Sequence, residues 1–230
     1  MNSIIKNIDN IKKKISAAAD GKDVTFIAVT KTFPVCDAET AIRAGLKDIA
    51  ESKIQEALPK FNVLSNQLNG ITKHFIGHLQ SNKAKKAVLN FDLIQSLDSM
   101  DLADAINKYA KEINKVQKCL LELKISFEES KFGVSSDKIY EMYKYCSQKC
   151  KNIALLGIMT IAPYFEKQEE VRPYFQKAYK VFQDIKEKSG DKNFQILSMG
   201  MSNDFEAAIQ EGSNMVRIGS AIFGERIYDK

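Results

Sequence analysis

The 230-residue sequence lacks any apolar run long enough to cross a membrane. A membrane helix needs roughly 20 consecutive apolar residues, and the longest apolar stretches here have the length of a β-strand. The first twenty residues predict an amphipathic surface helix and no signal peptide, because one helical face carries Ile4, Ile5, Ile8, Ile11 and Ile15. We therefore expect a cytoplasmic protein with no membrane partner.

Arginine is scarce, with four arginines against 30 lysines in a chain of net charge +5. Proteins that read DNA bases depend on arginine, and single-strand binders combine a basic groove with aromatic platforms. The basic residues here are spread over the whole chain, and the densest cluster, SNKAKK at 81–86, fits the solvated start of a helix. We expect no nucleic-acid partner.

Cysteine and histidine are too few and too scattered to predict a redox pair or a metal site. The four cysteines form no CxxC motif. The only histidines, His74 and His78, would share one face of a strand, but no further cysteine or carboxylate completes a recognised ligand pattern. We expect reduced structural thiols and no bound metal.

Strand-like and helix-like segments alternate from one end of the chain to the other. Near-continuous apolar runs, typical of parallel strands covered on both faces, occur at 24–31, 48–52, 73–78, 93–97, 118–126, 153–161, 193–200 and 215–219. Helical patterns follow them at 37–44, 53–67, 81–90, 99–115, 136–150, 167–189 and 203–211. This count, after one extra N-terminal helix, predicts a single (β/α)8 TIM barrel over residues 1–230.

The alternative is an open doubly wound sheet, and a missing glycine argues against it. Such a sheet usually carries a glycine-rich phosphate turn after its first strand. Here the corresponding stretch, VTKTFP at 29–34, contains no glycine. No linker or low-complexity segment divides the chain, so we predict one domain.

A lysine ends the first predicted strand. The carboxyl ends of barrel strands face the active site, so Lys31 would stand at the barrel mouth with its ammonium partly desolvated. Desolvation lowers the pKa of a lysine and supplies the neutral amine that forms a Schiff base with a carbonyl. The alternative is a lysine that extends its charge to solvent at the rim.

Glycine and hydroxyl residues follow the last two predicted strands, where barrel enzymes commonly bind phosphate. Ser198, Gly200 and Ser202 follow one strand, and Gly219 and Ser220 follow the other. Glycine lets backbone N–H groups approach phosphate oxygens, and serine adds a directed donor. The two loops together predict a phosphate cup.

Arg217 lies within the last apolar strand and is one of the few arginines. A buried guanidinium needs a partner, which could be a structural salt bridge or a ligand's ring nitrogen or phosphate. A Schiff-base lysine, a phosphate cup and an arginine at one barrel mouth are together what pyridoxal 5'-phosphate (PLP) requires.

Six motifs resemble the pyridoxal phosphate homeostasis proteins, the single-barrel relatives of the alanine racemase N-terminal domain. They are AVTKTFP, HFIGHLQSNK, EESKFG, GIMTIAP, LSMGMSNDFEAAI and MVRIGSAIFG, and the resemblance runs from Thr25 to Gly224. It implies a barrel that binds PLP as an internal aldimine, has no established turnover, and helps to control free PLP in the cytosol.

The resemblance implies a role for each matching residue. Lys31 matches the aldimine lysine, Arg217 the arginine facing the pyridine nitrogen, and Ser202, Gly219 and Ser220 the phosphate cup. The residues expected to line the cofactor or its phosphate-side loop are Met159, Thr160, Ser198, Met199 and Gly200.

The segment after the second predicted strand departs from the commonest pattern of the family. Ser52 stands where the family usually has asparagine, and Ala50 stands where it has glycine. Serine can still donate a hydrogen bond, although it is shorter. His78, at the end of the third predicted strand, is a further candidate contact with the cofactor.

Three functions remain open from the sequence. The first is a PLP carrier or regulator, with PLP-dependent apoenzymes as recipients. The second is a slow PLP-dependent amino-acid racemase, which would need a base on each face of the α-carbon. In the racemases that this barrel resembles, a second domain of a partner subunit supplies a tyrosine, and this chain ends at Lys230. We therefore expect a monomeric binding protein. The third function is a Schiff-base aldolase-like barrel that uses Lys31, and it predicts a colourless protein.

Overall fold

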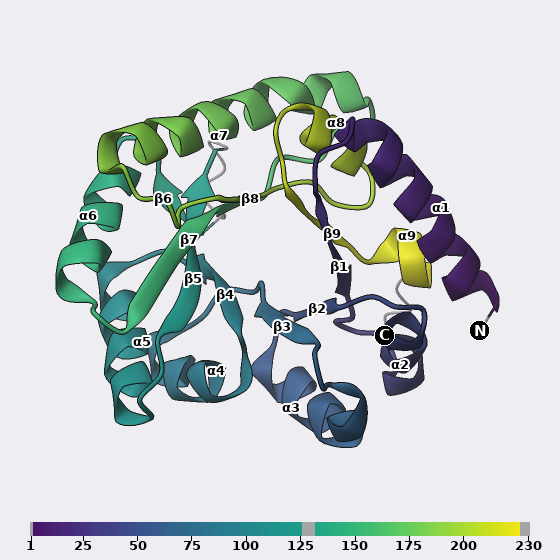
Figure 1. Ribbon diagram of the computed structural model, residues 1–230, viewed down its shortest axis with the longest axis horizontal. Helices are drawn as coiled ribbons and strands as arrows, with labels where there is room; N and C mark the ends of the chain where they lie inside the picture. The colour runs from purple at the N-terminus through teal and green to yellow at the C-terminus, as the bar shows by residue number, and fades with distance from the viewer. Residues whose placement is uncertain (1, 126–131, 226–230) are drawn as a thin grey trace.

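Eight parallel strands close into a barrel with helices outside in the computed structural model, which describes residues 2–125 and 132–225 (Figure 1). The barrel strands are β1 (Thr25–Val29), β2 (Asp48–Glu51), β3 (Thr72–Phe75), β4 (Leu93–Leu97), β5 (Gln117–Lys124), β7 (Ile153–Thr160), β8 (Ile196–Ser198) and β9 (Met215–Ile218). Their order is β4-β3-β2-β1-β9-β8-β7-β5, and pairing of β4 with β5 closes the ring. The predicted TIM barrel is confirmed.

A helix follows every barrel strand. These helices are α2 (Val35–Arg43), α3 (Ile54–Val63), α4 (Ala84–Asn90), α5 (Met100–Glu112), α6 (Ile139–Lys149), α7 (Gln168–Ser189), α8 (Phe205–Gln210) and α9 (Ser220–Phe223). The extra helix α1 (Asn2–Ala19) lies outside the barrel against α8 and α9 (Figure 1). Four of the five predicted isoleucines pack into a cluster that includes Ala28 and Val216. The exception is Ile5, which is exposed because it lies on a different side of the helix from the other four.

Three short elements were not predicted as separate pieces. Two are 3-10 turns, η1 (Ser65–Gln67) and η2 (Ser81–Lys83), which lie at the end of one helical pattern and the start of another. The third is β6 (Val134–Ser135), which pairs with β5 outside the ring. The four-residue helix α9 was also missed, because so short a segment has no helical periodicity to read.

Alternation along β1 and β9 separates the barrel interior from the helical layer. Ile27 and Val29 belong to the interior cluster, whereas Phe26 and Ala28 pack in the cluster with α1. In a strand successive side chains point to opposite faces. The same alternation turns Met215 and Arg217 of β9 into the barrel, opposite to Val216 and Ile218.

Several strands are shorter than predicted, and two of the differences move candidate residues. β1 ends at Val29, so Lys31 lies in the following turn and is not the last strand residue. β3 ends at Phe75, so His78 lies beyond the strand, and the two histidines do not share a strand face. Predicted strand 118–126 ends at Lys124, and Ser126 lies outside the described residues.

The structure of the described residues also bears on two expectations from the sequence, the lack of a membrane-spanning helix and the state of the cysteines. None of their helices combines the length and apolar character needed to cross a membrane. All four cysteines are free thiols; Cys119, Cys146 and Cys150 are buried, and Cys36 is exposed. Burial raises the pKa of Cys146 to about 12, so this thiol is protonated at neutral pH, as a structural residue would be.

Candidate functional site

Two adjoining cavities lie at the carboxyl ends of the barrel strands. One has a volume of about 230 Å³ and lies toward β9 and the loop before α8. The other has a volume of about 280 Å³ and lies toward β5 and the loop after β3. Lys31, Ile76 and Ile161 line both cavities, so the Lys31 side chain stands at their boundary.

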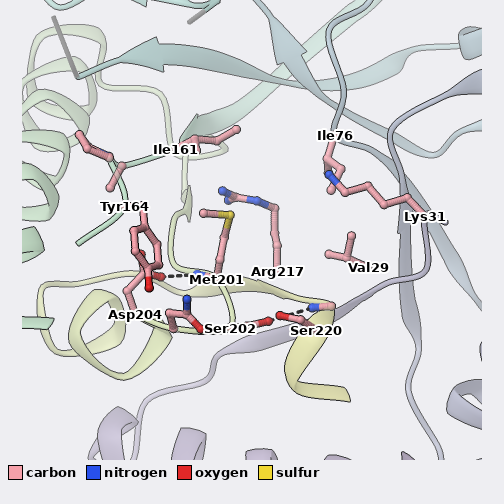
Figure 2. Close-up of a pocket in the computed structure, with 14 residues that line it drawn as sticks. Val29, Lys31, Ile76, Ile161, Tyr164, Met201, Ser202, Asp204, Arg217 and Ser220 are labelled. Atoms are coloured by element: carbon pink, nitrogen blue, oxygen red, sulfur yellow. Dashed lines mark hydrogen bonds between the residues drawn. The ribbon is translucent and has the colours of Figure 1, made fainter. Parts of the chain in front are cut away.

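Lys31 reaches the first cavity from a tight turn after β1. Phe33 N–H donates to the Thr30 carbonyl at 3.2 Å, and Thr32 has a φ of 67°, in the left-handed region. In Figure 2 Lys31 extends toward Ile76 on one side of the cavity, Tyr164 and Asp204 stand on the opposite side, and Arg217 rises between them.

A buried ion pair supports this turn from below. Lys60 of α3 contacts Glu51 Oε1 at 2.6 Å and donates to the Thr30 carbonyl at 2.6 Å, and the Thr30 hydroxyl donates to Glu51 Oε1 at 2.7 Å. The Glu51 and Lys60 side chains are 0% and 7% exposed. Burial raises the pKa of Glu51, and the Lys60 ammonium opposes that rise. The residue before Lys31 is thus tied to both charges.

The floor of the first cavity gathers backbone N–H groups onto one oxygen. Ser202 Oγ accepts from Gly219 N–H at 3.3 Å and from Ala221 N–H at 3.2 Å. A Cβ added at Gly219 would lie 3.3 Å from the Val29 carbonyl oxygen, so a side chain there would crowd β1. Ser220 also lines the cavity. The two N–H groups thus hold the Ser202 hydroxyl in place, and the Ser202 and Ser220 hydroxyls can both donate to an anion in the cavity.

Arg217 supplies a buried cation at the centre of the first cavity. Its side chain donates to Ser198 Oγ at 2.7 Å and to the Thr160 carbonyl at 2.8 Å. Burial lowers the pKa of Arg217 to about 10, against the opposing effect of the Asp204 and Glu122 carboxylates. The guanidinium therefore stays protonated at neutral pH and can only donate hydrogen bonds.

Five predicted site residues lie beneath the cavities and line neither of them: Met159, Thr160, Ser198, Met199 and Gly200. Met159 and Met199 are fully buried in the core. Gly200 has a φ of 95°, and a Cβ there would lie 2.6 Å from Ala208 Cβ, so its glycine is needed for packing on α8. Direct contact between these five residues and a cofactor stays a prediction.

The second cavity contains the remaining predicted residues and an acidic group. Ser52 and His78 both line it. His78 pairs with Asp98 at 3.2 Å and stacks on the ring of Phe132, with centroids 3.6 Å apart. Glu122 of β5 points into the same cavity and is 8% exposed.

Glu122 is the carboxyl group in these cavities that titrates near neutral pH. Burial, and to a smaller extent the nearby Asp98 carboxylate, raise the pKa of Glu122, Arg217 opposes them, and the resulting pKa is about 7. A carboxyl with such a pKa can hold or release a proton under ordinary conditions. Sequence reasoning missed it because a charged residue inside an apolar strand carries no sign of its pKa.

The raised pKa predicts that stability depends on pH through Glu122. Below about pH 4.5 both the folded and unfolded states are protonated, and Glu122 contributes nothing. As the pH rises toward 7, the unfolded chain loses its proton first, so stability falls, and above about pH 7 the full cost of up to about 3 kcal/mol remains.

Urea unfolding of wild type and Glu122→Gln tests this prediction. We expect the variant to gain stability relative to wild type when the pH is raised from 5 to 8.5. A difference between the two proteins that does not change with pH would show that Glu122 does not titrate in this range.

Other cavity residues were not predicted, chiefly Ile76, Tyr164 and Asp204. They lie on loops after strands, where residue type alone does not indicate which side chains face inward. The motif EESKFG falls largely outside the described residues.

The sequence and the structure were both compared with those of known proteins. The model of the alanine racemase N-terminal domain matches residues 1–227. The pyridoxal phosphate homeostasis protein of Aquifex aeolicus is 39% identical over 222 residues, which cover 96% of each chain. The structure of PipY of Synechococcus elongatus with PLP bound has a TM-score of 0.87 at 30% identity, covering 96% of this chain and all of that one.

More distant structures share the barrel alone. An alanine racemase of Clostridium difficile has a TM-score of 0.73 at 18% identity, and the match covers 58% of that chain. Full-length matches above 30% identity, together with the family model, decide the assignment. This chain belongs to the alanine racemase N-terminal domain family, and within it to the pyridoxal phosphate homeostasis proteins.

Proposed function

We propose that this protein binds PLP covalently through Lys31 and takes part in controlling the supply of the cofactor in the cytosol. The observation that carries the proposal is that Lys31, Arg217 and a group of phosphate-type donors line one cavity, the donors being Ser202, Gly219 and Ser220. These groups match the aldehyde, the ring nitrogen and the phosphate of PLP. The names of the relatives and the PLP-bound PipY structure support the same ligand.

The residues of the first cavity fit the group. Bound PLP would supply an aldehyde that condenses with the Lys31 amine as water leaves, giving a Schiff base. Ser202 would turn its hydroxyl hydrogen to a phosphate oxygen, because its oxygen already accepts from two N–H groups. Ser220 and the neighbouring backbone would complete the cup, and the closeness of Gly219 to Val29 leaves little room for a side chain at position 219.

Arg217 supports binding over turnover. A permanent cation that only donates leaves the pyridine nitrogen as an acceptor and disfavours its protonation. An unprotonated ring withdraws electrons weakly, so the site would hold the cofactor without strongly activating a substrate. A monomeric state and PLP-dependent apoenzymes as recipients stay predictions.

A slow amino-acid racemase is the second candidate, and Glu122 is the observation that favours it. Racemisation needs a proton donor and acceptor besides the Schiff-base lysine. Glu122 has a pKa of about 7 and lines the cavity that Lys31 shares. Its carboxyl could exchange a proton there.

Titration of the purified protein with PLP and with pyridoxal, which lacks the phosphate, tests the proposal. We expect PLP to give a visible absorption band that borohydride removes, with the reduced label on Lys31. We expect pyridoxal to bind about a hundredfold more weakly, because it loses two charge-assisted hydrogen bonds in the cup.

Two results would contradict the proposal. A protein that stays colourless with PLP would leave the aldolase-like interpretation of Lys31 in front. Equal binding of PLP and pyridoxal would show that the proposed cup does not bind the phosphate group. L-alanine incubated with the yellow protein separates the two candidates, since a carrier leaves its optical purity unchanged and a racemase lowers it.

A further inference from the structure

A chain of buried polar side chains crosses the barrel interior and ends at Arg217. His74 Nε2 lies 2.9 Å from Asp48 Oδ1, and His74 Nδ1 lies 3.0 Å from Gln95 Nε2. Gln95 Oε1 accepts from Ser198 Oγ at 2.7 Å, and Ser198 Oγ accepts from Arg217 at 2.7 Å. Each of the four side chains from His74 to Arg217 is at most 3% exposed.

The chemistry of Arg217 fixes the direction of this chain. A guanidinium only donates, so Ser198 Oγ accepts from Arg217 and must give its own hydrogen to its other partner among the described residues, Gln95. Gln95 therefore presents its amide oxygen to Ser198. Its amide nitrogen then faces His74, whose Nδ1 must be an acceptor.

The tautomer of His74 follows from the same argument. With Nδ1 as acceptor, the ring hydrogen is on Nε2 and is donated to the Asp48 carboxylate. If the Gln95 amide were reversed, the Ser198 hydroxyl would receive two donors, and its own hydrogen would lose its acceptor. An unsatisfied buried group costs free energy, so one arrangement is favoured from Asp48 to Arg217.

We propose that Gln95 is a positioning residue for the ring-nitrogen end of the PLP site. Arg217 donates hydrogen bonds to two described residues, the Ser198 hydroxyl, which Gln95 fixes, and the Thr160 carbonyl. Gln95 lies in the middle of β4, below both cavities, and lines neither of them. Its effect on the cofactor therefore passes through Arg217. The cofactor part of this inference rests on the proposed function.

The protein contains a second buried glutamine, Gln117, that serves as a matched control for Gln95. Gln117 of β5 is also a fully buried glutamine in a barrel strand, and its amide nitrogen donates to the carbonyls of Asp92 and Lys118. Neither of these contacts leads to Arg217. Gln95→Leu and Gln117→Leu therefore impose a similar loss of buried hydrogen bonds, but only the first disturbs Arg217.

The first experiment measures PLP retention and the visible spectrum of both variants. We expect Gln95→Leu to retain PLP about tenfold less well and to shift the absorption band, because Arg217 loses its fixed orientation toward the ring. Gln117→Leu should keep the wild-type band and affinity. A loss in Gln95→Leu no larger than in Gln117→Leu would overturn the proposal.

The second experiment needs no cofactor. Long-range ¹H–¹⁵N spectra of histidine-labelled protein resolve both ring nitrogens, and His78, the only other histidine, serves as the reference. We expect wild-type His74 to carry its hydrogen on Nε2. In Gln95→Glu a carboxylate faces Nδ1, so we expect Nδ1 to take up a second ring hydrogen from solvent while Nε2 keeps its own toward Asp48. In Ser198→Ala the amide loses its fixed direction, and the His74 signals should change.

These outcomes separate the positioning role from PLP binding itself. If wild type takes up no PLP, the proposed function fails, and a His74 response to Ser198→Ala still supports the directional chain. A hydrogen on Nδ1 of wild-type His74, or His74 signals that are unchanged in both variants, would contradict the proposed hydrogen-bond direction from Asp48 to Arg217. This holds whether or not PLP binds.

Discussion

The Lys31→Ala variant is expected to lose the visible PLP band and the borohydride-fixed label. Lys31 stands at the boundary of the two cavities, and among the described residues it is the lysine that lines the first cavity together with Ser202, Gly219 and Ser220. Loss of the covalent bond should weaken PLP retention by at least about a hundredfold, equivalent to about 3 kcal/mol. Absorption spectra, gel filtration with PLP, and peptide mapping after reduction measure the three effects.

Lys124 provides the matched control. It is another lysine at the cavities, lies at the end of β5 and lines only the second one. Lys124→Ala should keep the band, with the label still on Lys31. A label found on Lys124 in wild type, or a Lys31→Ala variant that stays yellow and is fixed by borohydride, would move the anchor away from Lys31.

Lys60→Met is expected to cause the largest loss of stability. It leaves the buried Glu51 carboxylate without its ammonium partner on Oε1. The other oxygen of the same carboxylate, Oε2, already has no hydrogen-bond partner among the described residues. Breaking a buried ion pair from one side costs about 3–5 kcal/mol. Urea unfolding should show this loss. The deficit should be larger at pH 8 than at pH 5, because burial raises the pKa of Glu51 and a protonated Glu51 needs no counter-charge.

Two controls make this prediction specific. Lys53 at the start of the same helix pairs with Glu56 at 3.0 Å, but its side chain is 65% exposed. Lys53→Met should therefore change stability by less than about 1 kcal/mol. The double variant Lys60→Met with Glu51→Leu should recover much of the loss. A Lys60→Met protein as stable as Lys53→Met would contradict a structural role for the ion pair.

The same ion pair links stability to the site. Lys60 and Glu51 both contact Thr30, the residue before Lys31, and Thr32 after it adopts a left-handed conformation. We therefore expect a refolded Lys60→Met protein to retain PLP less well than its folded fraction alone would explain. The turn that presents Lys31 would no longer be fixed.

Strand order and the main groups of the site were predictable from the sequence. Eight apolar runs alternating with helical patterns could bury their strands on both faces only in a layered α/β fold, and β4 at Leu93–Leu97 matches its predicted limits. Lys31, Ser202 and Gly219 were predictable because they follow these strands, and strand ends converge at one mouth. Arg217 was predictable because a guanidinium inside an apolar strand needs a partner.

The sequence by itself thus determined the barrel and the presence of Lys31, Ser202 and Gly219 at its mouth, because periodicity and strand ends are local properties. Only the tertiary structure decided what each buried polar group contacts. Lys60 reaching Glu51, Gln95 joining His74 to Ser198, and Glu122 near Arg217 and Asp98 all bring together residues from different strands and helices. Burial and pKa depend on the distance between such residues, and that distance exists only once the barrel has closed.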